Sequence, residues 1–158
     1  MDSFTATFTV KDASALVTMQ GALDEDTDLE NLNLKPYREI RFDLHGIQHI
    51  NSVGARSWIH WVSNFDRSKK YSLSNCPTVF VNQANLILGI VPEWMGVESF
   101  ELPYYCEHCS HSFGVMLELA SSRVVPEDVP ETAKCKKCGL LAELDTFPEK
   151  YFQFLQRK

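Results

Sequence analysis

The residues best suited to chemistry are two pairs of cysteines in the last third of the chain. Cys106 and Cys109 form one Cys-x-x-Cys pair, and Cys135 and Cys138 form the other. A Cys-x-x-Cys turn can place two thiolates on one side of a metal ion. Two such turns complete a tetrahedron with Zn–S distances of about 2.3 Å. The sequence therefore predicts a four-cysteine metal site, with Zn²⁺ as the metal.

The expected role of this metal is structural. A closed shell of four thiolates leaves no open position for a substrate or a water molecule. Gly139 directly follows Cys138 and suits the tight turn of a zinc knuckle. Apolar residues alternate over 113–119 after the first pair and follow the second pair over 140–144, which indicates a small β-ribbon. We expect zinc to stabilise a segment that is too small to build its own core.

Two other interpretations of the cysteines are possible. A thioredoxin-like redox pair lies at a helix N-terminus, whereas the residues after each pair here are strand-like. His108 and His111 could each replace a ligand, although four cysteines already complete the shell. A thiol-redox protein is therefore the less favoured alternative, and disulfides are less favoured still.

The charge of the chain argues against nucleic acid as the partner. The chain has 158 residues, with 15 basic and 21 acidic residues and a net charge of -6. Nucleic-acid binders usually carry a basic patch, and the only basic cluster near the cysteines is Lys134, Lys136 and Lys137. A nucleic-acid-associated zinc ribbon is kept as the alternative function.

Localisation follows from the absence of targeting signals in the sequence. The first residues contain neither a basic region nor an apolar region of a signal peptide. No apolar run approaches the roughly 20 residues that cross a membrane. Free cysteines without such a signal indicate the reducing cytoplasm, so we expect a cytoplasmic protein that has no membrane partner.

The first hundred residues alternate between strand and helix patterns. Strands are expected over 4–10, 15–19, 40–44, 71–73 and 100–104, the first two forming a hairpin, and helices over 53–64 and 78–88. His45 and Gly46 are expected to end the third strand. The last strand leads almost directly into Cys106, so the metal module should be rigidly attached to the sheet. This alternation predicts a layered α/β domain.

The junction before the first helix contains a second candidate site. Ser52 or Asn51 suits the N-cap of this helix, and a serine there is most simply a cap. A helix N-terminus also tolerates a phosphate, so Ser52 is a candidate phosphorylation site as well. Gly54 in the first turn indicates close approach of another backbone or of a partner. The acidic segment 24–30 is interpreted as a solvated loop, because it lacks the spacing of a calcium loop.

Three motifs in the first 105 residues resemble a known family. They are Gly21-Ala22-Leu23-Asp24, Ile40-Arg41-Phe42-Asp43-Leu44 and Ile50-Asn51-Ser52-Val53-Gly54. In this order they are similar to a STAS domain, the domain of sulfate transporters and anti-sigma-factor antagonists. The family carries an Asp-Ser-x-Gly step at this junction. Ser52 and Gly54 match it, and Asn51 stands where aspartate is common.

The resemblance implies a STAS-like layered sheet with helices on one face. It also implies a non-enzymatic bacterial signalling protein whose partner is a serine kinase, an anti-sigma factor or another regulator. Such a partner would phosphorylate Ser52 and dock on the first helix, at Asn51, Ser52, Gly54 and Arg56. The sequence contains no phosphate-binding glycine loop, nucleophile elbow or metalloprotease motif that would indicate an enzyme.

The expected organisation has three parts. Residues 1–103 form the STAS-like domain, 104–146 form the four-cysteine zinc-ribbon module, and 147–158 form a C-terminal helix with four large aromatic residues. The aromatic face of that helix packs on the sheet or ribbon in the simpler interpretation. In the alternative interpretation, this aromatic face stays exposed and binds a partner.

Overall fold

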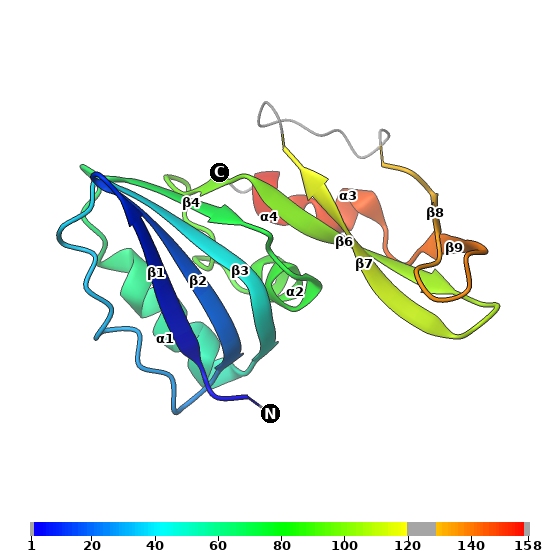
Figure 1. Cartoon of the computed structure of the whole chain (residues 1–158), viewed down its shortest axis with the longest axis horizontal. Helices are drawn as coiled ribbons and strands as arrows, with labels where there is room; N and C mark the ends of the chain where they lie inside the picture. Colours follow the sequence, from blue (N-terminus) through cyan, green and yellow to red (C-terminus); the bar gives the residue numbers. More distant parts are fainter. Residues whose placement is uncertain (1, 120–128, 157–158) are drawn as a thin grey trace.

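The computed structural model describes residues 2–119 and 129–156 and has two sheets joined side by side (Figure 1). In chain order the elements are β1 (Thr5–Lys11), β2 (Ser14–Leu23), β3 (Glu39–Ile50), α1 (Ser52–Ser63), β4 (Lys70–Ser74), α2 (Thr78–Leu86), β5 (Gly96–Val97), β6 (Ser99–Cys106), β7 (His111–Glu118), β8 (Thr132–Lys134), β9 (Leu141–Leu144), α3 (Pro148–Tyr151) and α4 (Gln153–Gln156). Within these described residues no helix is long and apolar enough to cross a bilayer.

The first sheet confirms the α/β class. Its strand order is β1-β2-β3-β4-β5. The hairpin expected at the start is present, because β1 and β2 pair antiparallel and Asp12 takes a left-handed turn conformation with φ 54°. The other neighbouring strands pair in parallel. Parallel neighbours require crossover connections, and α1 provides the one between β3 and β4.

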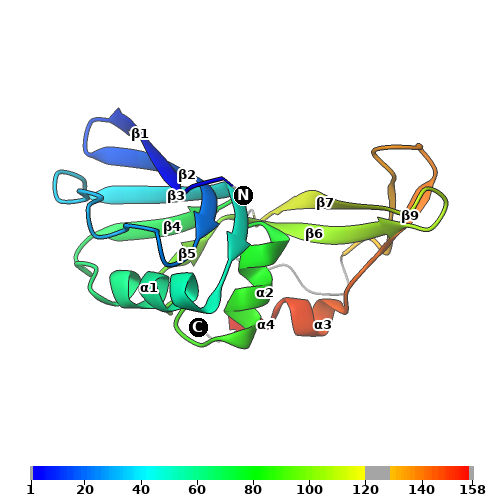
Figure 2. The same cartoon turned by 90° about the horizontal axis from the view of Figure 1, so that it is seen from below.

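Helices cover one face of this sheet (Figure 2). Alternate residues of β2 and β3 point to that face and are buried, among them Val17, Met19 and Phe42. The tryptophans of α1, Trp58 and Trp61, pack edge to face on Phe42, with ring centroids 6.2 and 5.5 Å away. Both are core residues as expected, and they fix the position of α1 on the sheet.

The third strand is longer than expected. His45 and Gly46 do not end it, because β3 continues to Ile50. Instead, its pairing with β2 shifts register between Thr18 and Gln20. A Cβ on Gly46 would lie 2.6 Å from Cγ of Gln20. The glycine therefore permits an irregularity within the strand, and the strand reaches the start of α1.

The strand that leads into Cys106 belongs to the second sheet. Its order is β7-β6-β9-β8, with all pairs antiparallel. The last strand expected over 100–104 is therefore present, but it lies in the second sheet and not beside the strands of the first. The two-residue strand β5 occupies the edge of the first sheet beside β4, and β6 forms one isolated parallel bridge, from Phe100 to Cys76 in the segment just after β4. The expected boundary between residues 103 and 104 falls inside β6.

The C-terminal segment joins the two sheets. Rings of Phe152 and Phe154 lie edge to face on Phe100, with centroids 5.1 and 5.3 Å away. The Asn85 amide of α2 donates to the Tyr151 carbonyl and accepts from the Phe154 N–H. Three of the aromatic residues are therefore packed, as in the simpler interpretation, while Phe147 is exposed. The segment expected as one helix over 147–158 contains two short helices, and residues 157–158 lie outside the described part.

Candidate metal centre and the first helix

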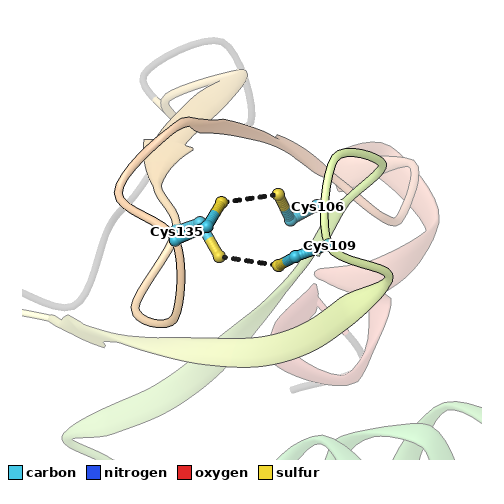
Figure 3. Close-up of side chains that lie close together, drawn as sticks. Cys106, Cys109 and Cys135 are labelled. Carbon is cyan, nitrogen blue, oxygen red and sulfur yellow. Dashed lines mark hydrogen bonds between the residues drawn. The ribbon is translucent and has the colours of Figure 1, made fainter.

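The four cysteines of the two pairs converge at the far end of the second sheet. Cys106 and Cys109 lie on the β6–β7 turn, and Cys135 and Cys138 lie on the β8–β9 turn. Their Sγ atoms all lie within 4.8 Å of one another. The closest pairs run between the turns, with 3.6 Å from Cys106 to Cys138 and 3.6 Å from Cys109 to Cys135. Figure 3 shows Cys106 and Cys109 facing Cys135 across the gap.

This geometry fits a zinc ion. A regular tetrahedron with Zn–S distances of about 2.3 Å has S···S edges of about 3.8 Å, close to the two shortest separations. A disulfide needs about 2.05 Å between its sulfurs, and all five cysteines are free. The cluster contains no histidine from the described residues, so His108 and His111 are not needed as ligands. The four cysteines are therefore compatible with a closed metal site.

Each Cys-x-x-Cys turn has the backbone conformation expected of a zinc knuckle, with a residue of positive φ after the second cysteine. Gly139 follows the second pair with φ +79°, and its N–H donates to the Cys135 carbonyl. Ser110 takes the same place after the first pair, with φ 55°. The residue type indicates the turn at Gly139 but not at Ser110, because serine rarely adopts this conformation. The Lys137 N–H points at the Cys135 sulfur from 3.4 Å and would help to hold a thiolate.

The metal-free thiols have unequal proton affinities. Burial raises the pKa of Cys135, but N–H groups of Cys138 and Lys137 and the neighbouring thiols outweigh it and lower that pKa to about 6. Burial and hydrogen bonds to the other three thiols raise the pKa of Cys109 to about 12. One thiolate is therefore favoured before a metal arrives. Binding of the metal must displace the other protons.

The surroundings of the cluster do not provide the redox geometry considered above. Strands β7 and β9 follow the two pairs, so neither pair begins a helix.

The basic cluster of Lys134, Lys136 and Lys137 is also smaller in the structure than the sequence implies. Lys136 donates its Nζ to the Gly114 carbonyl and lies 5.6 Å from the centre of the Phe113 ring. Lys134 and Lys137 remain beside the metal site.

The N-cap of α1 is Asn51, which leaves Ser52 outside the capping interaction. The Asn51 side-chain oxygen accepts the Gly54 N–H at 2.8 Å. Ser52 is the first helical residue, and its side chain is exposed. Within residues 2–119 and 129–156 its hydroxyl has no hydrogen-bond partner. Arg56, one turn further along, is exposed as well.

Asn51 also connects α1 to the acidic loop 24–30. Its amide nitrogen donates to the Glu25 carboxylate at 2.7 Å. A hydrogen bond from the backbone and then this bond from Asn51 lower the pKa of Glu25. An aspartate at position 51, as is common in the resembled family, would place a second carboxylate against Glu25. The asparagine keeps the cap and avoids that repulsion.

Removal of the Asn51 amide is expected to have two measurable effects. Asn51→Ala loses the cap and should cost about 1 kcal/mol of unfolding free energy. Asn51→Asp keeps an acceptor for the Gly54 N–H but loses the donor to Glu25. It should therefore raise the pKa of Glu25, as followed by NMR titration of the carboxyl carbon. An unchanged Glu25 titration in Asn51→Asp would contradict the assigned contact.

Gly54 is placed by close contact with the chain's own backbone. A Cβ at this position would lie 1.9 Å from the Leu23 carbonyl oxygen at the end of β2. Of the two reasons considered for this glycine, the structure shows close approach of another backbone. The N-terminus of α1 consequently packs directly against the end of β2.

Comparisons with known proteins add little beyond the chain's own geometry. No family model matches the sequence, and no curated protein matches it. Among solved structures, one similar chain is an anti-sigma factor antagonist from Mycobacterium paratuberculosis. It is 14% identical, with a TM-score of 0.46, over 53% of this chain and 77% of that one. The α/β class rests on the sheet order and helices described above.

Proposed function

We propose that this chain is a non-enzymatic regulatory module that binds a protein partner through α1, in the manner of STAS domains, and that Ser52 is its switch. The observation that supports the switch is the exposed Ser52 hydroxyl beside an N-cap that Asn51 already provides. Phosphorylation of Ser52 would therefore not remove the cap. The proposed partner is a serine kinase, an anti-sigma factor or another regulator in the bacterial cytoplasm.

The chemistry of the switch is electrostatic. A phosphate on Ser52 would add about -1.5 to -2 charge at the first turn of α1. Free N–H groups at a helix N-terminus stabilise such a charge. Asn51 holds Glu25 near the same turn, and four more acids lie in the loop over 24–30. The phosphate would therefore repel this loop and change the surface that the partner meets.

The metal has a structural role in this proposal. Zn²⁺ bound by the four cysteines would hold the β6–β7 and β8–β9 turns together. It would supply charge neutralisation for the thiolates and no catalytic step, because its shell would be complete. Helix α1 and these turns lie toward opposite ends of the molecule in both views (Figures 1 and 2). Docking on α1 would therefore leave the metal end free.

Phosphorylation in a host extract tests the switch. We expect ATP-dependent phosphate on Ser52 by mass spectrometry, and none in Ser52→Ala. Ser63→Ala is the matched control, because Ser63 is also exposed on α1 but its hydroxyl donates to the His60 carbonyl. A pull-down should recover different partners with Ser52→Ala and Ser52→Asp. If no phosphate is found on Ser52, only unregulated partner binding is left of the proposal. If both variants recover the same partners, Ser52 is not a switch.

A further inference from the structure

We propose that β1 is a homodimer interface at which the β1 strands of two copies of this chain pair antiparallel. The strand lies at the edge of the first sheet, and in the described part of the chain it pairs with β2 alone. Seven residues of one backbone edge are therefore left without a strand partner. An unpaired edge of this length is a template for another strand.

Most of β1 lacks the features that usually protect an edge strand. Its one charged residue is Lys11, at the C-terminal end; from Ser3 to Val10 it contains no charge, proline or glycine, and its register with β2 has no bulge. The edge at the other end of this sheet is the two-residue β5, and β8 in the second sheet has three residues. The other long edge strand, β7, has Lys136 lying against it. Of these edges, β1 is the long one whose only charge, Lys11, lies at its end.

The side chains of β1 also lack full cover on the helical side. Phe4, Ala6 and Phe8 are half-buried, and Val10 is 49% exposed. Among the residues that the structure describes, the Phe8 ring has one aromatic neighbour, Tyr37, at 6.0 Å. A row of four apolar residues thus continues past the edge of the core. A neighbouring strand that carries its own apolar row would complete the cover.

A second copy is the occupant that fits this pattern. Antiparallel pairing about a two-fold axis at Thr7 would place Ala6 opposite Phe8 and Phe4 opposite Val10 on the helical face. The exposed threonines at 5, 7 and 9 would meet one another on the other face. The net charge of -6 makes two copies repel overall. The residues from Ser3 to Val10 are uncharged, however, and Lys11 of each copy would lie opposite Ser3 of the other, so the paired strands add no repulsion of their own.

Light scattering coupled to size exclusion tests the proposal on the full chain. We expect twice the 18.0 kDa chain mass for the wild type at micromolar concentrations. Val10→Lys should shift the mass to that of the monomer, because it places two charges in the shared apolar row. Ser112→Lys introduces the same charge at an exposed position of β7 and should stay dimeric.

Circular dichroism separates loss of pairing from loss of folding. Val10 is half exposed, so the lysine variant should keep the wild-type spectrum and melt as a folded monomer. A second variant, Thr9→Lys, tests the same edge from the exposed face. A monomeric wild type would overturn the proposal. So would a dimer that both β1 variants leave intact.

Discussion

Chelation of zinc is expected to unfold the two cysteine turns while the five-stranded sheet stays folded. The β6–β7 and β8–β9 turns are held together at their tips by the four sulfurs, whose closest separations are 3.6 Å. Strand β8 has three residues and β9 has four, too few to keep this end ordered alone. We expect one equivalent of zinc per chain by atomic emission. Amide exchange should rise at the turns after chelation.

Alkylation gives the sharpest readout of the same event. The four ligand cysteines should resist a thiol reagent until zinc is removed and then react together. Cys76 is fully buried between β4 and α2 and should stay protected in both states. Cys135→Ser should abolish stoichiometric zinc, whereas His108→Ala in the first turn should retain it, because His108 lies outside the sulfur cluster.

Lowering the pH should release zinc from the four cysteines, as a chelator does. Zinc competes with protons for the thiolates, so its affinity is expected to fall as the pH falls. Reactivity of all four cysteines at neutral pH in freshly purified protein that still holds zinc would contradict a four-sulfur site. Loss of zinc in His108→Ala would contradict it as well.

Gly54→Ala is expected to destabilise the first domain by about 3 kcal/mol, which lowers Tm by about 8 °C in a chain of this length. The added Cβ would lie 1.9 Å from the Leu23 carbonyl oxygen and 2.7 Å from the Asp24 nitrogen. Both are backbone atoms, so no side-chain rotation relieves the clash. The Leu23 carbonyl also accepts the Asn51 N–H at 3.1 Å, which holds the contact in place.

Helix propensity alone predicts the opposite sign for this substitution. Alanine is favoured over glycine in a helix by about 1 kcal/mol, so an open site would be stabilised. Gly96→Ala is the matched control, because the nearest atom to its added Cβ is 3.7 Å away. Thermal and denaturant unfolding of both variants measure the difference. A Gly54→Ala protein as stable as Gly96→Ala would show that α1 does not press on β2.

The sequence predicts the local features of this molecule well. The cysteine spacing identifies four residues that the structure brings within 4.8 Å. Alternation over 4–10 and 15–19 identifies the hairpin, because period two depends on a strand's own side chains. The tryptophan spacing in α1 identifies its buried face in the same way. Each of these patterns depends on residues that are close in sequence.

Features that depend on distant residues were not predictable in this way. The alternation of Phe100, Leu102 and Tyr104 identifies a strand but does not say which sheet it joins. That choice depends on eight register pairs with β7 and on the rings of Phe152 and Phe154. Likewise, Asn51 and Ser52 both suit an N-cap by type, and the contact with Glu25, 26 residues away, accompanies the choice of Asn51.

Strand β6 has a mechanical consequence for the whole molecule, because it can act as a lever arm. At Phe100 it contacts the rings of Tyr151, Phe152 and Phe154 and forms the bridge to Cys76, and at Cys106 it ends in one of the four clustered cysteines. Pairing with β7 along its whole length stiffens it. Six residues of strand span about 20 Å, so a rotation of about 10° at Phe100 would swing the Cys106 end by about 3 Å. A small tilt of the rings around Phe100 would thus be magnified at the far tip of the protein.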